Sequence, residues 1–318
     1  MNLVREIVAA ERRIRPIVRE TPVDFSHTLS ARSSAQVYLK LEHLQHTGSF
    51  KLRGAVNKML SLTKAARRSG VIAASTGNHG MAVSYAACEL GTKATIYMSP
   101  GVAKVKLDMI RALGGKPVFY GKNPVDAESR AREVAERSSV PFISPYNDED
   151  VIAGQGTLGV ELHRQIENVD AVFVSVGGGG LISGIAAYLK SKQPRVKIIG
   201  CWAKNSCVLY QSLRAGRIGV FPEKPTISDG TAGGVEPGAI TFELCRSLID
   251  DTVLVTESEI LRAMKLILRG DRWLVEGAAG VAVAGFLKQQ RKFAGKKVAL
   301  VLCGRNIPAE KAKKLLSG

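Results

Sequence analysis

The pattern of apolar and polar residues switches along the chain between short apolar runs and longer amphipathic stretches. The short runs predict strands, and stretches with apolar residues three and four positions apart predict helices. In the first half of the chain, strands are predicted at residues 37–41, 71–74, 94–98 and 117–120. Helices are predicted between and after these strands, at residues 51–62, 81–90, 103–113 and 126–138.

The second half continues the alternation of strands and helices. Strands are predicted at residues 171–176, 196–200, 251–255 and 298–302, and helices at 157–165, 181–190, 239–248 and 257–268. A Gly/Pro-rich stretch at 216–238 interrupts the series. This order is typical of α/β layers around parallel sheets. The 318 residues suffice for two compact lobes or one large domain, and Ser144-Pro145-Tyr146-Asn147 indicates a boundary near residues 145–150.

Composition indicates a globular protein of enzyme size, with 45% hydrophobic residues and 32 glycines. The N-terminus has no apolar segment that would indicate a secretory signal. The longest uncharged stretch, residues 171–189, contains four consecutive glycines, which favours strand, loop and helix over a membrane span. The five cysteines are scattered and none forms CxxC, so we expect a cytoplasmic protein without a disulfide framework or metal site.

The chain carries 45 basic and 28 acidic residues, a formal charge of +17, which raises the possibility of nucleic-acid binding. The basic residues are dispersed, however, and the aromatic residues, 6% of the chain, do not interleave with them. No zinc finger or RNA-binding motif is present. We therefore interpret the charge as solvated surface that can attract anionic substrates.

Three motifs carry the candidate chemistry. Lys51 lies in Ser49-Phe50-Lys51-Leu52-Arg53-Gly54-Ala55, directly after an aromatic residue. The second motif is the loop Ser75–Gly80, and the third is the tetraglycine Gly177–Gly180. Alone, each has an ordinary explanation as a solvated lysine, a helix cap or a tight turn. Together, near the carboxyl ends of strands where α/β folds bind ligands, they predict covalent capture of pyridoxal phosphate (PLP).

The tetraglycine follows an apolar strand and opens a helix. Glycines let backbone N–H groups approach a phosphate, and the helix N-terminus adds a favourable dipole. The loop is not GxGxxG, and no Walker lysine follows it, which weakens the alternative of a nucleotide-binding oxidoreductase.

With these motifs the chain resembles the serine/threonine dehydratase family of PLP enzymes, the tryptophan-synthase β-like group of fold type II, which also contains serine racemase. The resemblance extends from Thr21-Pro22 to Cys303-Gly304-Arg305-Asn306. It implies a two-lobed, three-layer α/β fold with the cofactor in the cleft. The large lobe would comprise residues 1–40 and 149–318, and the small lobe residues 41–148.

The resemblance also assigns roles to individual residues. Lys51 would form the Schiff base, Phe50 would stack on the pyridine ring, and Asn78 would bond its hydroxyl. Cys303 would face the ring nitrogen. The phosphate would be held by Gly177, Gly178, Gly179 and Gly180, and the substrate carboxylate by Ser75, Thr76, Gly77 and His79.

Departures from the family pattern refine the expectation. The racemase branch has a catalytic serine where this chain has Thr76, which makes racemisation less expected. Ile199-Gly200 is followed by Cys201-Trp202-Ala203 and not by the glutamate-proline pair of the metal-binding branch. The chain ends shortly after Cys303, so we expect no regulatory domain of the biosynthetic type. Residues 228–238 and Trp202 most resemble the dehydratases of hydroxyectoine utilisation.

The function expected from the sequence is β-elimination on a β-hydroxy amino acid, which yields a 2-oxo acid and ammonia. The amine of Lys51 would remove the α-proton. A neutral thiol at Cys303 would leave the ring nitrogen largely unprotonated, which suits elimination better than transamination. A serine racemase-like enzyme remains an alternative, and a homodimer is what the family implies. Neither nucleic acid nor membrane is an expected partner.

Overall fold

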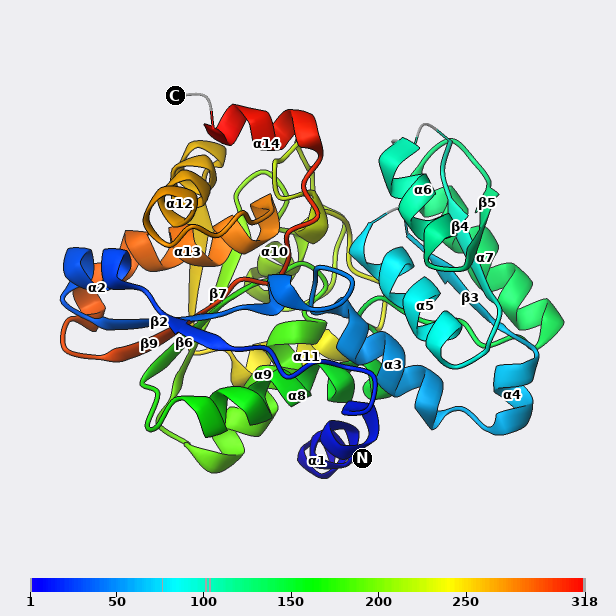
Figure 1. The fold of residues 1–318 in the computed structure, drawn as a ribbon, viewed down its shortest axis with the longest axis horizontal. Coiled ribbons are helices and arrows are strands. Elements are labelled where there is room, and N and C mark those ends of the chain that lie inside the picture. Colours follow the sequence, from blue (N-terminus) through cyan, green and yellow to red (C-terminus); the bar gives the residue numbers. More distant parts are fainter. Residues whose placement is uncertain (1, 76, 101, 103, 317–318) are drawn as a thin grey trace.

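The computed structural model describes residues 2–75, 77–100, 102 and 104–316, and its strands form two sheets (Figure 1). The larger sheet has the strand order β1-β2-β9-β6-β7-β8. Its strands are β1 (Val23–Phe25), β2 (Gln36–Lys40), β9 (Lys297–Val301), β6 (Ala171–Ser175), β7 (Lys197–Ala203) and β8 (Asp251–Val255). Only β1 and β2 pair antiparallel among these neighbours, so the sheet is essentially parallel.

Helices cover both faces of the larger sheet. Helix α13 (Gly277–Gln289) packs on one face, and α9 (Gly180–Lys192) on the other, with α8 (Glu149–Gln165) and α1 (Leu3–Ile14) behind it. The remaining helices of this part are α2 (His27–Ser33), α10 (Val208–Ala215), α11 (Ile240–Leu248), α12 (Glu257–Gly270) and α14 (Ala309–Leu316). None of the helices described is long and apolar enough to cross a membrane.

The smaller sheet is parallel, with the order β3-β4-β5 (Val71–Ala74, Ala94–Met98, Gly115–Phe119). Because side chains alternate across a strand, Ala73 and Ile96 face α5 (Asn78–Glu89), whereas Ile72 and Tyr97 face α7 (Pro124–Ser138). Helices α3 (Lys51–Ser61), α4 (Lys64–Arg68) and α6 (Lys104–Ala112) complete this part. The three-layer α/β architecture predicted from the sequence is therefore confirmed.

Several predicted boundaries were wrong. Helix α8 begins at Glu149, eight residues before the predicted start, with Asp148 as N-cap accepting from the backbone N–H of Val151 at 3.0 Å. The glycines of α8 made its first turns look like a loop in the sequence. Gly154 shows why a glycine is needed, because a Cβ there would lie 2.6 Å from the backbone oxygen of Arg53. Strand β1 and helices α1, α2, α4, α10, α13 and α14 were not predicted.

A buried ionic network anchors α3, the helix that begins with Lys51. Arg53 bonds Glu42 and Glu161 through its guanidinium nitrogens at 2.7 Å each. Lys40 on β2 reaches the second oxygen of Glu161 at 2.5 Å, and all four side chains are fully buried. The network joins α3 to β2 and α8, so the backbone next to Lys51 is held from two sides.

Candidate active site

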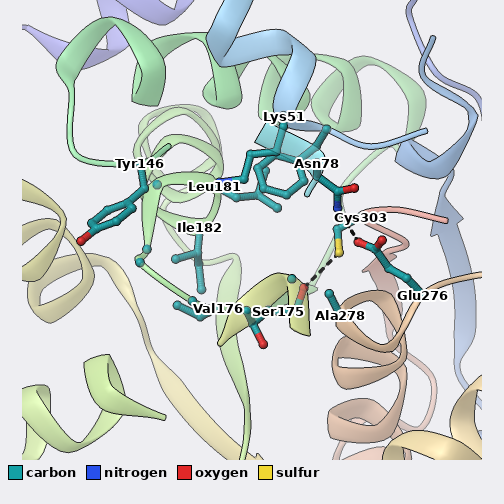
Figure 2. Close-up of a pocket in the computed structure, with 17 residues that line it drawn as sticks. Lys51, Asn78, Tyr146, Ser175, Val176, Leu181, Ile182, Glu276, Ala278 and Cys303 are labelled. Carbon is teal, nitrogen blue, oxygen red and sulfur yellow. Dashed lines mark hydrogen bonds between the residues drawn. The ribbon is translucent and has the colours of Figure 1, made fainter. Parts of the chain in front are cut away.

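A pocket lies at the carboxyl ends of β6 and β9, which are neighbours in the larger sheet (Figure 2). The pocket is lined by residues that the sequence marked, namely Phe50, Lys51, Asn78, Gly177, Gly178, Gly179, Gly180 and Cys303. Tyr146, Ser175 and Glu276 also line it and were not among the predicted site residues. The fold thus brings segments together that lie far apart in the chain.

Lys51 is the first residue of α3, and Phe50 is its N-cap. Its Nζ donates to the backbone oxygen of Pro145 at 2.7 Å and lies 5.2 Å from the centroid of the Phe50 ring. Burial lowers the pKa of Lys51 to about 8, since desolvation penalises the charged ammonium. A larger share of neutral amine at neutral pH is what a Schiff-base lysine requires.

The tetraglycine connects β6 to the N-terminus of α9, which starts at Gly180. Gly179 has a φ of 88°, in the left-handed region that favours glycine. A Cβ on Gly178 would lie 2.5 Å from the ring of Tyr146, and one on Gly177 would lie 2.9 Å from the backbone oxygen of Thr231. Side chains are excluded here, and the loop can present its backbone N–H groups to an anion at the helix N-terminus.

Asn78, Glu276 and Asn306 form a hydrogen-bonded chain at the pocket wall (Figure 2 shows the first two). Asn78 Nδ2 donates to Glu276 Oε1 at 2.8 Å, and Asn306 donates from its side chain to Asn78 Oδ1 at 2.6 Å and from its backbone to Glu276 Oε2 at 3.0 Å. Burial raises the pKa of Glu276 to about 7, although both hydrogen bonds oppose the shift. The amide of Asn78 keeps one N–H hydrogen for a ligand.

Glu276 is the functional candidate that sequence reasoning missed. A signal existed, because Glu276 is the single charged residue in the run from Trp273 to Leu287. A carboxylate is rarely placed in such a run unless it has a partner. The partners, Asn78 and Asn306, could be recognised only from the fold.

Cys303 lies just beyond β9 with its thiol against Ser175, whose hydroxyl donates to Sγ at 3.4 Å. Burial, together with the charge of Glu276, raises the pKa of the Cys303 thiol to about 12. The thiol is therefore neutral at physiological pH. That is the protonation state which the sequence interpretation assumed, while contact with a ring nitrogen stays a prediction.

The predicted carboxylate-binding loop lies at the start of α5, and its residues Ser75, Gly77 and His79 are not in the pocket lining, while Thr76 lies outside the described residues. His79 is buried and its Nε2 contacts the backbone oxygen of Ile143 at 2.8 Å. Desolvation and the charge of Lys51 lower the pKa of His79 to about 3, so the ring is neutral. The imidazole of His79 is therefore bonded to Ile143 and is not available to a ligand. The backbone N–H groups in the first turn of α5 have no partner within the helix and are available.

These groups fit pyridoxal phosphate. The pocket combines a desolvated amine, a side-chain-free phosphate cradle at a helix N-terminus, and an aromatic ring beside the amine. Among the residues described, no group of three or more His, Cys, Asp or Glu side chains could hold a metal ion. Fold and site together define a PLP enzyme built on a three-layer α/β scaffold.

Comparison with known proteins gives the family. Residues 14–304 match the family described as pyridoxal-phosphate dependent enzyme, and the chain belongs to it. The chain is 39% identical to the L-threonine ammonia-lyase of Thermotoga maritima, over 100% of this chain and 79% of that protein. It is 36% identical to the catabolic L-threonine dehydratase TdcB of Escherichia coli K12, over 98% and 95% of the two chains.

Solved structures of similar fold agree with the family found from the sequence relatives. Processed threonine deaminase isoform 2 from Solanum lycopersicum is similar with a TM-score of 0.94 and 35% identity, covering 99% of this chain and 92% of that one. Maize serine racemase is similar with a TM-score of 0.93 and 30% identity, covering 98% and 96%. The family resemblance and the PLP cofactor inferred from the sequence motifs are confirmed.

Proposed function

We propose that this chain is a PLP-dependent dehydratase that converts a β-hydroxy α-amino acid to a 2-oxo acid and ammonia, with L-threonine as the first substrate to test. The observation that carries the proposal is Lys51, a buried amine with a pKa lowered to about 8, in one pocket with the tetraglycine. The relatives named L-threonine ammonia-lyase and L-threonine dehydratase support the choice of reaction.

In this proposal Lys51 would hold the cofactor, and the N–H groups of the tetraglycine would bind its phosphate. The ring of Phe50 would contact the pyridine ring of the cofactor. The free N–H hydrogen of Asn78 bonds the ring hydroxyl. The substrate carboxylate is bound by backbone N–H groups at the N-terminus of α5, where the helix dipole favours an anion. We assign this role to the backbone of the Ser75–His79 loop, because the imidazole of His79 is bonded to Ile143.

When bound, the cofactor supplies delocalisation of the electron pair left at the α-carbon. The neutral amine of Lys51 accepts the α-proton, which its lowered pKa permits at neutral pH. The β-hydroxyl takes up a proton and leaves as water, and the released 2-amino-2-enoic acid tautomerises to an imine, which water hydrolyses to the 2-oxo acid and ammonia. Cys303, neutral because burial raises its pKa to about 12, does not supply charge that would hold a proton on the ring nitrogen.

A serine racemase-like activity is the second candidate, since maize serine racemase has the same fold at 30% identity. The two functions separate in one experiment on L-serine, in which ammonia release reports elimination and D-serine formation reports racemisation. We expect ammonia release to dominate, because Thr76 stands where the racemase branch has its serine base.

Finer statements from the sequence remain predictions. They are the lobe boundaries, 1–40 with 149–318 against 41–148, a homodimer, a cytoplasmic location and a role in hydroxyectoine degradation. Assays of ammonia release from threonine, serine, 3-hydroxyaspartate and hydroxyectoine-derived compounds test the substrate. Sedimentation of the purified protein tests the homodimer.

The experiment that tests the proposal is Lys51→Ala, with Lys58→Ala on the same helix as its matched control. The Lys51 variant should lose ammonia release and the borohydride-fixable cofactor while keeping its circular dichroism spectrum. The control should keep both, because Lys58 pairs with Asp148 and Asp150 at the surface side of α3. Peptide mapping that finds the reduced cofactor on a different lysine would refute the assignment.

A further inference from the structure

A second cavity lies away from the active site, between α2, α12 and the C-terminal part of α13. We call it the basic groove. Its volume is about 510 Å³, within the range of small-molecule sites. The basic groove is lined by five cationic side chains, Arg32, Arg262, Lys265, Arg269 and Lys288. The sequence showed these residues only as part of a dispersed positive charge, whereas the fold collects them in one place.

Two of the positive charges in the basic groove, those of Arg32 and Arg262, lack an acidic partner among the described residues. Glu259 is its single acidic lining residue, and its carboxylate is already used by the N-cap of α12 and by Lys288, whose Nζ lies 3.3 Å away. Arg32 and Arg262 are exposed and make no ion pair with any residue that the structure describes. Two guanidinium groups thus face a concave surface without a carboxylate partner.

The floor of the basic groove is apolar. Leu266 and Leu287 are half-buried there, and Ala284, which also lines the groove, is buried. An occupant must therefore combine negative charge with an apolar or planar group. Guanidinium forks match the oxygens of a phosphate in a bidentate manner, and the two guanidinium groups of Arg32 and Arg262 favour a dianion over a single carboxylate.

We propose that the basic groove is a binding site for a small organic phosphate, a phosphate monoester on an apolar or planar group. Its limited volume and the dispersion of the other basic residues argue against a nucleic acid. The site is separate from the cofactor pocket but shares a helix with it. Helix α13 follows Glu276 of the pocket directly and carries Leu287 and Lys288 of the groove in its last turn.

The test is calorimetric titration of phenyl phosphate into PLP-saturated holoenzyme at low ionic strength. Saturation with PLP keeps the probe out of the tetraglycine cradle. Inorganic phosphate is the comparison ligand, since it offers the charge without the apolar group. The test variant is Arg32→Glu/Arg262→Glu. The control is Arg67→Glu/Arg68→Glu on the remote helix α4, which changes the net charge by the same amount.

The proposal expects one phenyl phosphate per chain, bound more tightly than inorganic phosphate. The groove variant should weaken binding by about tenfold or more, because two charge-assisted contacts become repulsive, while the α4 variant should bind as the wild type does. Thermal melts of both variants report whether they fold. Absence of binding, equal weakening in both variants, or displacement of the probe by a short single-stranded oligonucleotide that binds more tightly would each overturn the proposal.

Discussion

Gly178→Ala tests how firmly Tyr146 fixes the phosphate loop. The added Cβ would lie 2.5 Å from Cγ and Cδ1 of Tyr146, whereas ordinary contact begins at 3.4 Å. The ring is tethered at its far end, since its hydroxyl accepts from the backbone N–H of Glu236 at 2.8 Å. The loop must therefore retreat by the difference, about 0.9 Å.

A retreat of that size removes hydrogen bonds from the loop to a phosphate. An N–H···O distance of about 2.9 Å would grow to roughly 3.8 Å, which is no longer a hydrogen bond. Overpacking of this kind costs about 1–3 kcal/mol. We expect the same loss in PLP binding, a rise in the Kd of roughly 5- to 150-fold.

The assay is equilibrium titration of apoprotein with PLP, followed by the visible absorbance of the bound cofactor. Gly234→Ala is the control, because a Cβ there meets nothing within 4 Å. Tyr146→Ala and the double variant complete a double-mutant cycle, in which removal of the ring should restore much of the affinity lost in Gly178→Ala. If Gly178→Ala binds PLP with wild-type affinity, or if the double variant recovers no PLP affinity, the ring of Tyr146 does not fix the position of the phosphate loop.

Three further predictions concern the surroundings of the pocket. Glu276→Gln should flatten the pH dependence of apoprotein stability between pH 4.5 and about 7. The raised pKa means that the folded state binds an extra proton there, so wild-type stability falls as pH rises through this window; an unchanged slope in thermal melts would contradict it. Arg53→Met should lower the free energy of unfolding in urea by about 3–5 kcal/mol, because Glu42 and Glu161 lose their buried guanidinium partner; a loss below 1 kcal/mol would be inconsistent with this. Cys303→Ser should keep elimination, whereas Cys303→Asp should lower the ratio of ammonia release to deuterium incorporation at the α-carbon, since a carboxylate can keep a proton on the ring nitrogen. If Cys303→Asp keeps the wild-type ratio, the side chain at position 303 does not face the ring nitrogen.

Helix α13 shows where sequence patterns stop being informative. Residues 277–286 are all buried, so no polar face alternates with the apolar one and the helical period is invisible. The strands, and the helices near Lys51, were easier to predict from the sequence than α13. Each of them has either a solvated face or a clear turn at its end. Glycines in α8 misled the prediction in the opposite way, since they serve close contact with neighbouring helices and do not break the helix.

The residues of the site also differ in how far the sequence alone could identify them. Lys51 with its aromatic neighbour and the tetraglycine are contiguous motifs, so one segment of sequence suffices to recognise each. Glu276 meets Asn78 across 198 positions of the chain, and its chemistry depends on burial that only the fold creates. The bond of His79 to Ile143 is likewise a product of tertiary packing.

The parallel pairing of β2 with β9 has a consequence for the order of folding. Gln36 is in register with Lys297, so β2, whose other edge pairs with β1, gains its second partner only after about 260 more residues have been synthesised. At about 5–20 residues per second, β2 waits on the order of 10 to 50 seconds on the ribosome with one edge unpaired. The β3-β4-β5 sheet is contiguous between residues 71 and 119 and can close long before. The nascent chain therefore exposes a strand edge until its last strand emerges, a period in which we expect it to depend on chaperones.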